Sequence, residues 1–509
     1  MATEAEILLT RKNQTYIDRE EQLRVNILAL NGGRPYIDNR LTRFPAESDV
    51  EWNGSAVLHK ESTFSNVQPG VKGRRERAYL INNAFRIAEK IRQFVFATAP
   101  DREGLPEEYA DDINRQGMSI DALMGRVCHL STACRWAWVG VDMPRIKGED
   151  GQPRRISRAE AQAMKVRPYW QWYGANEVVD WKFNELGELE WLITERFELF
   201  SANPAQEPVQ HVIRHVWMPG MLRVVVGEVP KGTVPSIYNP PKLVKDEEVP
   251  IDIDIVPFTP VGDISGLPYW YDDIEGIQRA IMDLESANDA MYFKQIYPQL
   301  VLPASVSNEM TGQSGPDDLA RNVNAIVGGA YAILEDQDHK GITRFVMPDG
   351  SALDSIQKEL ERKRTHMYGV VGMALTKQTR MAESAESKAY DHLDTEAVLR
   401  DKANMLAEAE RKAIEISRAW SADFPEYVPE YAQSFDIGDI HDDIRSLVDL
   451  SNMDTTDGIK RVVLEAAFKK AQKIGDVSMS DDEVDAILEE IKNFSTTTRF
   501  EFNPDDLDD

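Results

Sequence analysis

The chain has 509 residues, of which 42% are hydrophobic and 28% charged, an ordinary balance for a globular protein of about two to four packing units. Acidic side chains outnumber basic ones by 86 to 58, which gives a formal net charge of −28. This excludes a protein that grips nucleic acid over its whole surface, because such binding needs clustered Lys and Arg. It leaves open a protein past which DNA slides without adhering, although solubility alone also explains an acidic surface.

The first half of the chain alternates between helical and strand-like periodicity. Helices are expected at 14–29, 75–98 and 119–135, the last with Ser119 as its N-cap. The residues at 136–144 are strand-like, and 169–200 alternates around a turn at 184–187. A hairpin over 211–229 turns at Pro219–Gly220. Residues 230–250 are then expected to be an exposed loop, and 249–258 a strand.

The second half is mainly helical. Apolar residues recur at helical spacing over 271–296, 352–372 and 386–420. The first two helices are separated by a weakly periodic stretch with two short strands, and the last two by the polar segment 375–387. Short acidic helices are expected between 440 and 493, followed by a disordered acidic tail. The pattern predicts an α+β fold that is mainly helical.

The cellular compartment of the protein can be inferred from its two cysteines and its first residues. Cys128 and Cys134 are too few for a four-ligand metal site and lie six residues apart, so we expect buried, reduced thiols in a cytosolic chain. The N-terminal segment MATEAEILLTRKNQ lacks a basic stretch followed by an apolar run. No apolar stretch approaches the ~20 residues that span a bilayer. Neither a signal peptide nor a membrane segment is therefore expected.

No motif in the sequence indicates an enzyme. The phosphate-binding loop, the dinucleotide fingerprint, the nucleophile elbow and the zinc-protease motif are all absent from the sequence. Asp252 and Asp254 would share one face of the expected strand and could hold a divalent cation, but a half-buried strand with one wet face is the better interpretation. His211 and His215 are interpreted as surface or packing residues. We therefore predict no catalytic residues, no metal and no cofactor.

An aromatic cluster between 169 and 191 could suggest base stacking. Trp170 and Trp172 would share one strand face, and no basic residue stands between the rings from Tyr169 to Trp181. A nucleic-acid platform needs basic residues as well as aromatic rings, so a sheet core is the better interpretation.

The order of segments resembles the portal proteins of tailed bacteriophages. The resemblance lies in the run RPYWQWYGANEVVDWKF with its continuation to 200, in FTPVG at 258–262, in LPYWYDDIEGIQRAIMDLESANDAMYFKQIYPQLVL at 267–302, and in the long stretch 341–420. It is one of pattern and order over about 80–490, since portals have no invariant catalytic signature. It implies a portal-like fold with a wing, a stem, a clip and a crown.

The resemblance assigns a place to each segment. It implies a wing at 1–265, a descending stem helix at 266–298, a clip at 299–350 and an ascending stem helix at 351–373. A tunnel loop at 374–387, a long wing helix at 388–435, crown helices at 436–495 and a disordered acidic tail at 496–509 complete the chain.

The same resemblance implies a function and partners. The subunit would form a homododecameric ring at one capsid vertex of the virion, a closed heterologous assembly, after synthesis in the host cytoplasm. Double-stranded DNA would be packaged and ejected through the ring. The ring would dock the terminase large subunit, whose ATPase supplies the work, and later the head–tail adaptor and tail proteins. It would also contact the major capsid protein and, where one is used, a scaffold protein. No membrane contact is implied.

Two groups of residues are assigned to sites in this scheme. The tunnel loop would present Lys377, Gln378, Thr379 and Arg380 to DNA, although an ordinary helix–helix linker explains the same polar residues. On the ascending stem helix, a segment of mixed charge suits ion pairs between subunits better than a DNA-binding stripe; its residues are Lys358, Glu361, Arg362 and Arg364.

Two other classes of function remain open at this stage. Another virion protein, of the head-completion or tail type, would share the acidic α+β character. A hydrolase or nuclease would use Asp252, Asp254 and neighbouring carboxylates, and would show metal-dependent turnover.

Overall fold

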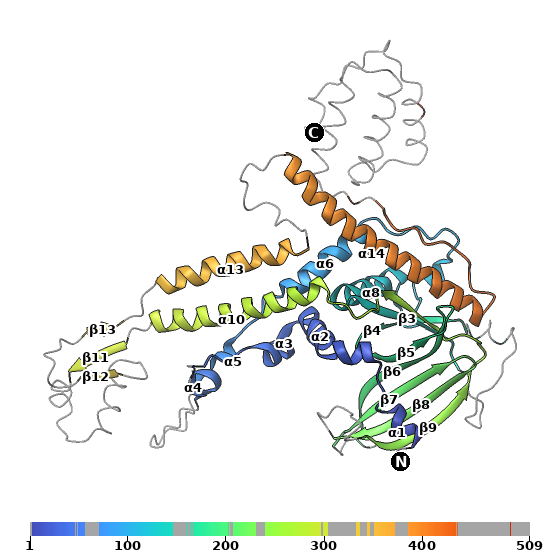
Figure 1. Ribbon diagram of the computed structural model, residues 1–509, viewed down its shortest axis with the longest axis horizontal. Helices are drawn as coiled ribbons and strands as arrows, with labels where there is room; N and C mark the ends of the chain where they lie inside the picture. Colours follow the sequence, from blue (N-terminus) through green and yellow to red (C-terminus); the bar gives the residue numbers. More distant parts are fainter. Residues whose placement is uncertain are drawn as a thin grey trace, which may run out of the picture. The chain divides into compact units, whose positions relative to one another are not determined.

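The computed structural model (Figure 1) divides the chain into two compact units, Met1–Gln433 and Ser434–Asp509. The structure describes residues 3–45, 47, 49–55, 71–145, 160, 164, 166–201, 203, 207–230, 240–296, 299–303, 332–335, 344–346, 351–371, 385–433, 435 and 489. Apart from Glu489, the expected crown helices at 436–495 and the acidic tail lie outside these residues. The description below therefore concerns the first unit.

Eight helices are described before the first long strand. They are α1 (Glu4–Leu8), α2 (Gln14–Asn31), α3 (Gly33–Arg40), α4 (Asp49–Asn53), α5 (Arg74–Arg77), α6 (Asn83–Val95), α7 (Glu107–Ala110) and α8 (Ile120–Cys134). Ser119 caps α8 as predicted, its Oγ accepting from the Ala122 amide at 3.2 Å. The single helix expected at 75–98 is wrong. Asn82 caps α6 by accepting from the Phe85 amide, so the chain forms two helices there.

Two antiparallel sheets form the β-rich middle of the chain. The first has the order β10-β3-β4, from β3 (Trp136–Asp142), β4 (Tyr169–Gly174) and β10 (Phe258–Gly262). The second follows chain order from β5 to β9: β5 (Val178–Phe183), β6 (Leu189–Phe200), β7 (Val209–Met218), β8 (Met221–Val229) and β9 (Lys242–Pro250). A short pair joins β1 (Gly54–Ser55) to β2 (Val71–Lys72). The hairpin predicted to turn at Pro219–Gly220 is confirmed.

Two expectations on either side of Pro250 are wrong. The expected exposed loop contains the edge strand β9, which pairs with β8. Of the expected strand at 249–258, only the two ends are strand: its first two residues close β9, and Phe258 begins β10. The strand does not form because the backbone after Pro250 bonds to Gly220 in the β7–β8 turn. Ile251 N donates to Gly220 O, and Gly220 N donates to Ile253 O. This segment therefore closes the β7–β8 turn instead of extending a ladder.

Helices α8 and α14 (Ala385–Trp420) enclose the three-stranded sheet. Trp136, Trp138 and Trp170 are fully buried there, and Cys128 and Cys134 lie buried on α8 as expected. The Trp170 indole donates to Ser417 Oγ at 2.8 Å, which fixes α14 against the sheet. The core interpretation holds for Trp170, whereas Trp172 is only half-buried.

The N-terminal segment covers part of the five-stranded sheet. Leu9 packs with Val212 and Val225, and the fully buried Arg214 donates to the carbonyls of Leu8 and Arg11 at 2.8 and 2.6 Å. The Asn13 amide also donates to Val179 O, on the outer side of β5. This segment thereby satisfies the sheet's first edge.

Helices α10 (Trp270–Ile296) and α13 (Ser351–Gly369) run side by side (Figure 1). They match the helices predicted at 271–296 and 352–372. Between them the chain forms a small mixed sheet of order β12-β11-β13, from β11 (Gln299–Pro303), β12 (Ala332–Glu335) and β13 (Arg344–Val346). Strand β11 pairs in parallel with β12 and antiparallel with β13.

Candidate functional site: the paired helices

Two polar contacts fix the register of α10 against α13. Arg364 forms an ion pair with Glu285, and Gln357 donates to the Tyr292 hydroxyl at 2.9 Å. Tyr292 lies seven residues after Glu285, whereas Gln357 lies seven before Arg364. Seven residues are about two helical turns, so the helices are antiparallel and keep one register over about 10 Å.

The α13 side of this pair repeats every seven residues. Leu353, Leu360 and Met367 are buried at this spacing, with exposed fractions of 7%, 4% and 0%. A seven-residue apolar repeat keeps one helical face against a partner helix. On α10, Met282 and Asn288 are buried, and the Asn288 Oδ1 accepts no hydrogen bond from any residue that the structure describes. The repeating face of α13 is thus apolar.

The first half of α10 is held to the N-terminal helices by carboxylate contacts. Arg19 of α2 binds Asp272 at 2.7 Å, and Arg40 of α3 binds Glu275 at 2.7 Å. Glu275 is only 3% exposed, so this ion pair is shielded from solvent.

Arg74 extends this anchorage towards the middle of α10. It is buried, donates to Ser286 Oγ at 2.8 Å and binds Glu47 at 2.7 Å. The Phe44 ring lies 4.3 Å from its guanidinium. Nearly three turns of α10 follow Ser286, and among the described contacts these turns pair with α13. The helix pair therefore extends from a base that several ion pairs hold.

The residues predicted to make stem contacts lie on α13. Lys358 and Glu361 are exposed and form no ion pair with any residue that the structure describes. Arg362 binds Glu359 at 2.7 Å within the helix and, with Lys363, holds the pKa of the Glu359 carboxyl at about 2. Arg364 is occupied by Glu285 of its own chain. Lys358 and Glu361 are therefore the members of the predicted set with charges available to a neighbour.

The predicted tunnel-loop residues Lys377, Gln378, Thr379 and Arg380 lie outside the described residues. The description resumes at Ala385, so the last residues of the expected loop already belong to the 36-residue helix α14.

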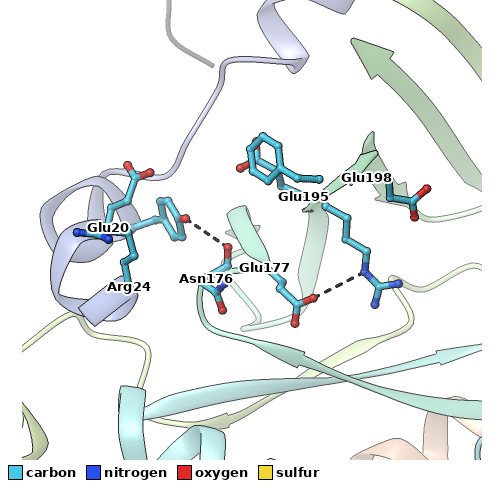
Figure 2. Close-up of a pocket in the computed structure, with 9 residues that line it drawn as sticks. Glu20, Arg24, Asn176, Glu177, Glu195 and Glu198 are labelled. Carbon is cyan, nitrogen blue, oxygen red and sulfur yellow. Dashed lines mark hydrogen bonds and ion pairs between the residues drawn. The ribbon is translucent and has the colours of Figure 1, made fainter. Parts of the chain in front are cut away.

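A cleft of about 450 Å³ lies between α2 and the five-stranded sheet (Figure 2). The Tyr16 hydroxyl donates to Asn176 O at 3.3 Å, and Glu177 lies 3.7 Å from Arg196. Both contacts are drawn as dashed lines in Figure 2, where Asn176 and Glu177 are labelled. Of its other carboxylates, Glu20 binds Lys12 at 2.6 Å, and Glu195 binds Arg214. Since three of the four carboxylates that line the cleft are already paired, we assign no small-molecule ligand to it.

The candidate metal and histidine sites do not assemble. Asp252 and Asp254 lie on the irregular segment after β9 instead of one strand face, which removes the expected geometry. His211 and His215 lie on β7; His211 stacks on Phe200, and burial lowers the pKa of His215 to about 4. Within the described residues, no group of three or more His, Cys, Asp or Glu side chains could hold a metal ion.

Comparison with protein families gives a match in the second half of the chain. Residues 304–421 match the model of a family described as a domain of unknown function, DUF4055, which is often found in phage head-completion proteins. The matched span contains α13 and α14. No curated protein matches the chain. Among the described helices, none is long and apolar enough to cross a membrane.

Proposed function

We propose that this chain is a structural subunit of a phage portal ring, through which double-stranded DNA is packaged and ejected. The observation that carries the proposal is the antiparallel pair α10–α13, anchored at one end and joined by a small sheet at the other. A rigid helical pair with a separate terminal sheet suits a subunit that lines a channel with helices and docks partners at their end.

The family match supports the same class of protein. It begins in the segment expected to be the clip and ends at the close of α14, so it covers the last of the four stretches on which the resemblance to portals is based. In the proposed scheme α10 and α13 form the stem, the segment with β11–β13 forms the clip, and α14 returns to the wing. The partners are the terminase at the clip, then the adaptor and tail proteins.

Mechanism follows from charge and shape, since the proposed ring hydrolyses nothing itself. Twelve copies at −28 each carry about −336 before counter-ions condense, a field that keeps DNA from adhering to the wall. A few basic side chains at the narrowest point would make weak, reversible phosphate contacts. In this proposal those are Lys377 and Arg380.

The deciding experiment for the ring is the size of the purified full-length chain. Negative-stain microscopy and mass photometry should show closed rings of about twelve subunits. A chain that stays monomeric or forms small open oligomers at micromolar concentration contradicts the portal assignment and favours another head-completion or tail protein.

The tunnel-loop assignment has its own test. Rings carrying Lys377→Ala with Arg380→Ala should package DNA but release it more readily, because phosphate contacts at the constriction are lost. The matched control is Lys242→Ala with Lys245→Ala on β9, which removes the same charge elsewhere. Normal DNA retention by the loop variant would remove the loop's assigned role.

A further inference from the structure

Strand β6 is longer than the strand that pairs with it on one side. Strand β5 pairs with β6 only as far as Thr194, whereas β7 pairs with it as far as Phe200. Just past the end of that pairing, Glu195 N still donates to Glu177 O at 2.7 Å. From 196 to 200, no described strand pairs with β6 on this side. We call this stretch the open edge of β6.

The backbone of the open edge directs hydrogen-bonding groups outwards. Successive residues of a strand point their N–H and C=O groups alternately to its two sides. The groups of Phe197 and Leu199 therefore point the same way as Glu195 N, which is away from β7. An added antiparallel strand would exchange two hydrogen bonds with each of these two residues.

The side chains of the open edge are unusually apolar for a strand edge. All five residues are exposed, and the exposed fractions of Phe197, Leu199 and Phe200 are 44%, 59% and 55%. The outer strands of the same sheet are protected, because the N-terminal segment bonds to β5 and five of the nine residues of β9 are charged. An exposed apolar edge beside protected ones indicates a site for pairing with another chain.

The cleft of about 450 Å³ between α2 and the sheet lies along this edge (Figure 2). Phe197 and Glu198 line it on the sheet side, and Tyr16 lines it on the α2 side. The cleft therefore leaves space beside the backbone of β6. Glu198 is exposed and is the carboxylate of this cleft that forms no ion pair with any described residue. A cationic side chain opposite it would complement its charge.

We propose that the open edge of β6 binds an extended peptide segment of a partner protein as an added strand. The added strand runs antiparallel to β6, as every neighbouring pair in this sheet does. Main-chain hydrogen bonds supply the affinity, and the side chains of the edge select the sequence. Opposite Leu199, Glu198 and Phe197 the partner carries an apolar residue, a Lys or Arg, and a second apolar residue. The inference is independent of the proposed ring, because one subunit contains the whole site.

The probe for this site is a fluorescein-labelled peptide of sequence Thr-Val-Lys-Val-Thr-Thr, whose valines would face Leu199 and Phe197. Fluorescence anisotropy with the full chain should give a Kd of at most about 1 mM. N-methylation of both valines removes the N–H groups that donate to the edge, and should weaken binding at least about tenfold. Leu199→Pro should weaken binding as much, because proline removes an outward N–H while the bonds to β7 stay intact.

A charge exchange tests the sequence preference. Glu198→Lys should reverse it, so that the peptide with Glu in place of Lys binds more tightly than the original one. The matched control is Glu185→Lys in the β5–β6 turn, which makes the same charge change away from the edge and should keep the wild-type preference.

The inference is overturned if the wild-type chain does not bind the peptide at about 1 mM, or if N-methylation leaves binding unchanged. Its Tm shows whether Leu199→Pro is folded; if it is not, the methylated peptide and the charge exchange decide. A wild-type chain that ignores the peptide but self-associates, and loses self-association in Leu199→Pro, would assign the edge to a second copy and overturn the peptide proposal.

Discussion

Arg214 shows how a single buried charge is accommodated in this fold. Its guanidinium is fully buried, binds Glu195 and donates to the carbonyls of Leu8 and Arg11 at the end of α1. Those carbonyls lack partners inside the short helix, so one side chain both balances a carboxylate and caps a helix end. The N-terminal segment depends on it.

Arg214→Met should lower the free energy of unfolding by about 3–5 kcal/mol, because it leaves Glu195 charged and unpaired in the interior. Urea unfolding followed by tryptophan fluorescence measures the change. Adding Glu195→Gln should recover part of the loss, since the uncompensated charge is then gone. A single variant as stable as wild type would show that Glu195 finds another partner.

His215 gives stability a defined pH dependence. Burial, with help from Arg196 and Arg145, lowers its pKa from about 6.5 to about 4. Above pH 6.5 both the folded and the unfolded forms are neutral, so the full stability is present. As the pH falls from 6.5 towards 4, His215 binds a proton in the unfolded chain but not in the folded one. The free energy of unfolding therefore decreases over this pH range.

His215→Gln should remove this component. Between pH 7 and pH 5 the wild type should lose about 2 kcal/mol more than the variant, from 1.36 kcal/mol for each unit below 6.5. Urea unfolding of both proteins at the two pH values provides the comparison. Equal losses would mean that His215 titrates normally in the folded protein.

At the scale of elements, the α10–α13 pair depends on its seven-residue repeat. Leu360 lies in the middle of that repeat and is 4% exposed. Leu360→Ala should cost about 2–5 kcal/mol through the cavity it leaves. Hydrogen exchange should show faster exchange of the α13 amides, with the core around α8 unchanged. The matched control is Lys358→Ala on the exposed face, which should stay within about 0.5 kcal/mol of wild type; unaltered α13 exchange in Leu360→Ala would contradict the packing.

The helices were predictable because their apolar periodicity is local. The repeat that gives α13 its buried face is visible within one stretch of sequence, as is the Ser119 cap of α8. Strand β9 was missed because nearly all its residues are exposed and five of the nine are charged, as suits an edge strand, so no alternation marks it. Asp252 was misplaced because Gly220, far away in the sequence, takes up its neighbours' backbone groups.

The candidate site was predictable only in part for the same reason. Lys358 and Arg364 could be placed on one helix, but nothing local shows that Arg364 is occupied by Glu285. The pairs Arg19–Asp272 and Arg40–Glu275 join residues more than two hundred positions apart. In the sequence, Lys402 looks like an ordinary helix lysine. Its burial cannot be predicted locally, because it depends on α8 packing against α14. Tertiary contacts of this kind leave no periodic signal.

At the scale of the whole molecule, the charge of −28 opposes adhesion to DNA, as the proposed function requires. The purified chain should not retard double-stranded DNA in a gel at ~50 mM salt, where basic proteins bind strongly. A histone-like basic protein serves as the positive control. Retardation that weakens steeply with added salt would reveal a phosphate-binding surface. It would contradict the interpretation that DNA slides past the protein without adhering.

Because α10 and α13 keep a fixed register, labels placed on the two helices can report a change in the distance between them. Its two native cysteines are buried on α8 and should resist labelling under native conditions. Tyr292→Cys with Gln357→Cys would therefore place the only accessible thiols on facing helices near the free end of the pair. Spin labels or a fluorophore and quencher there would report any separation of the two helices, in a lone subunit or in the proposed ring.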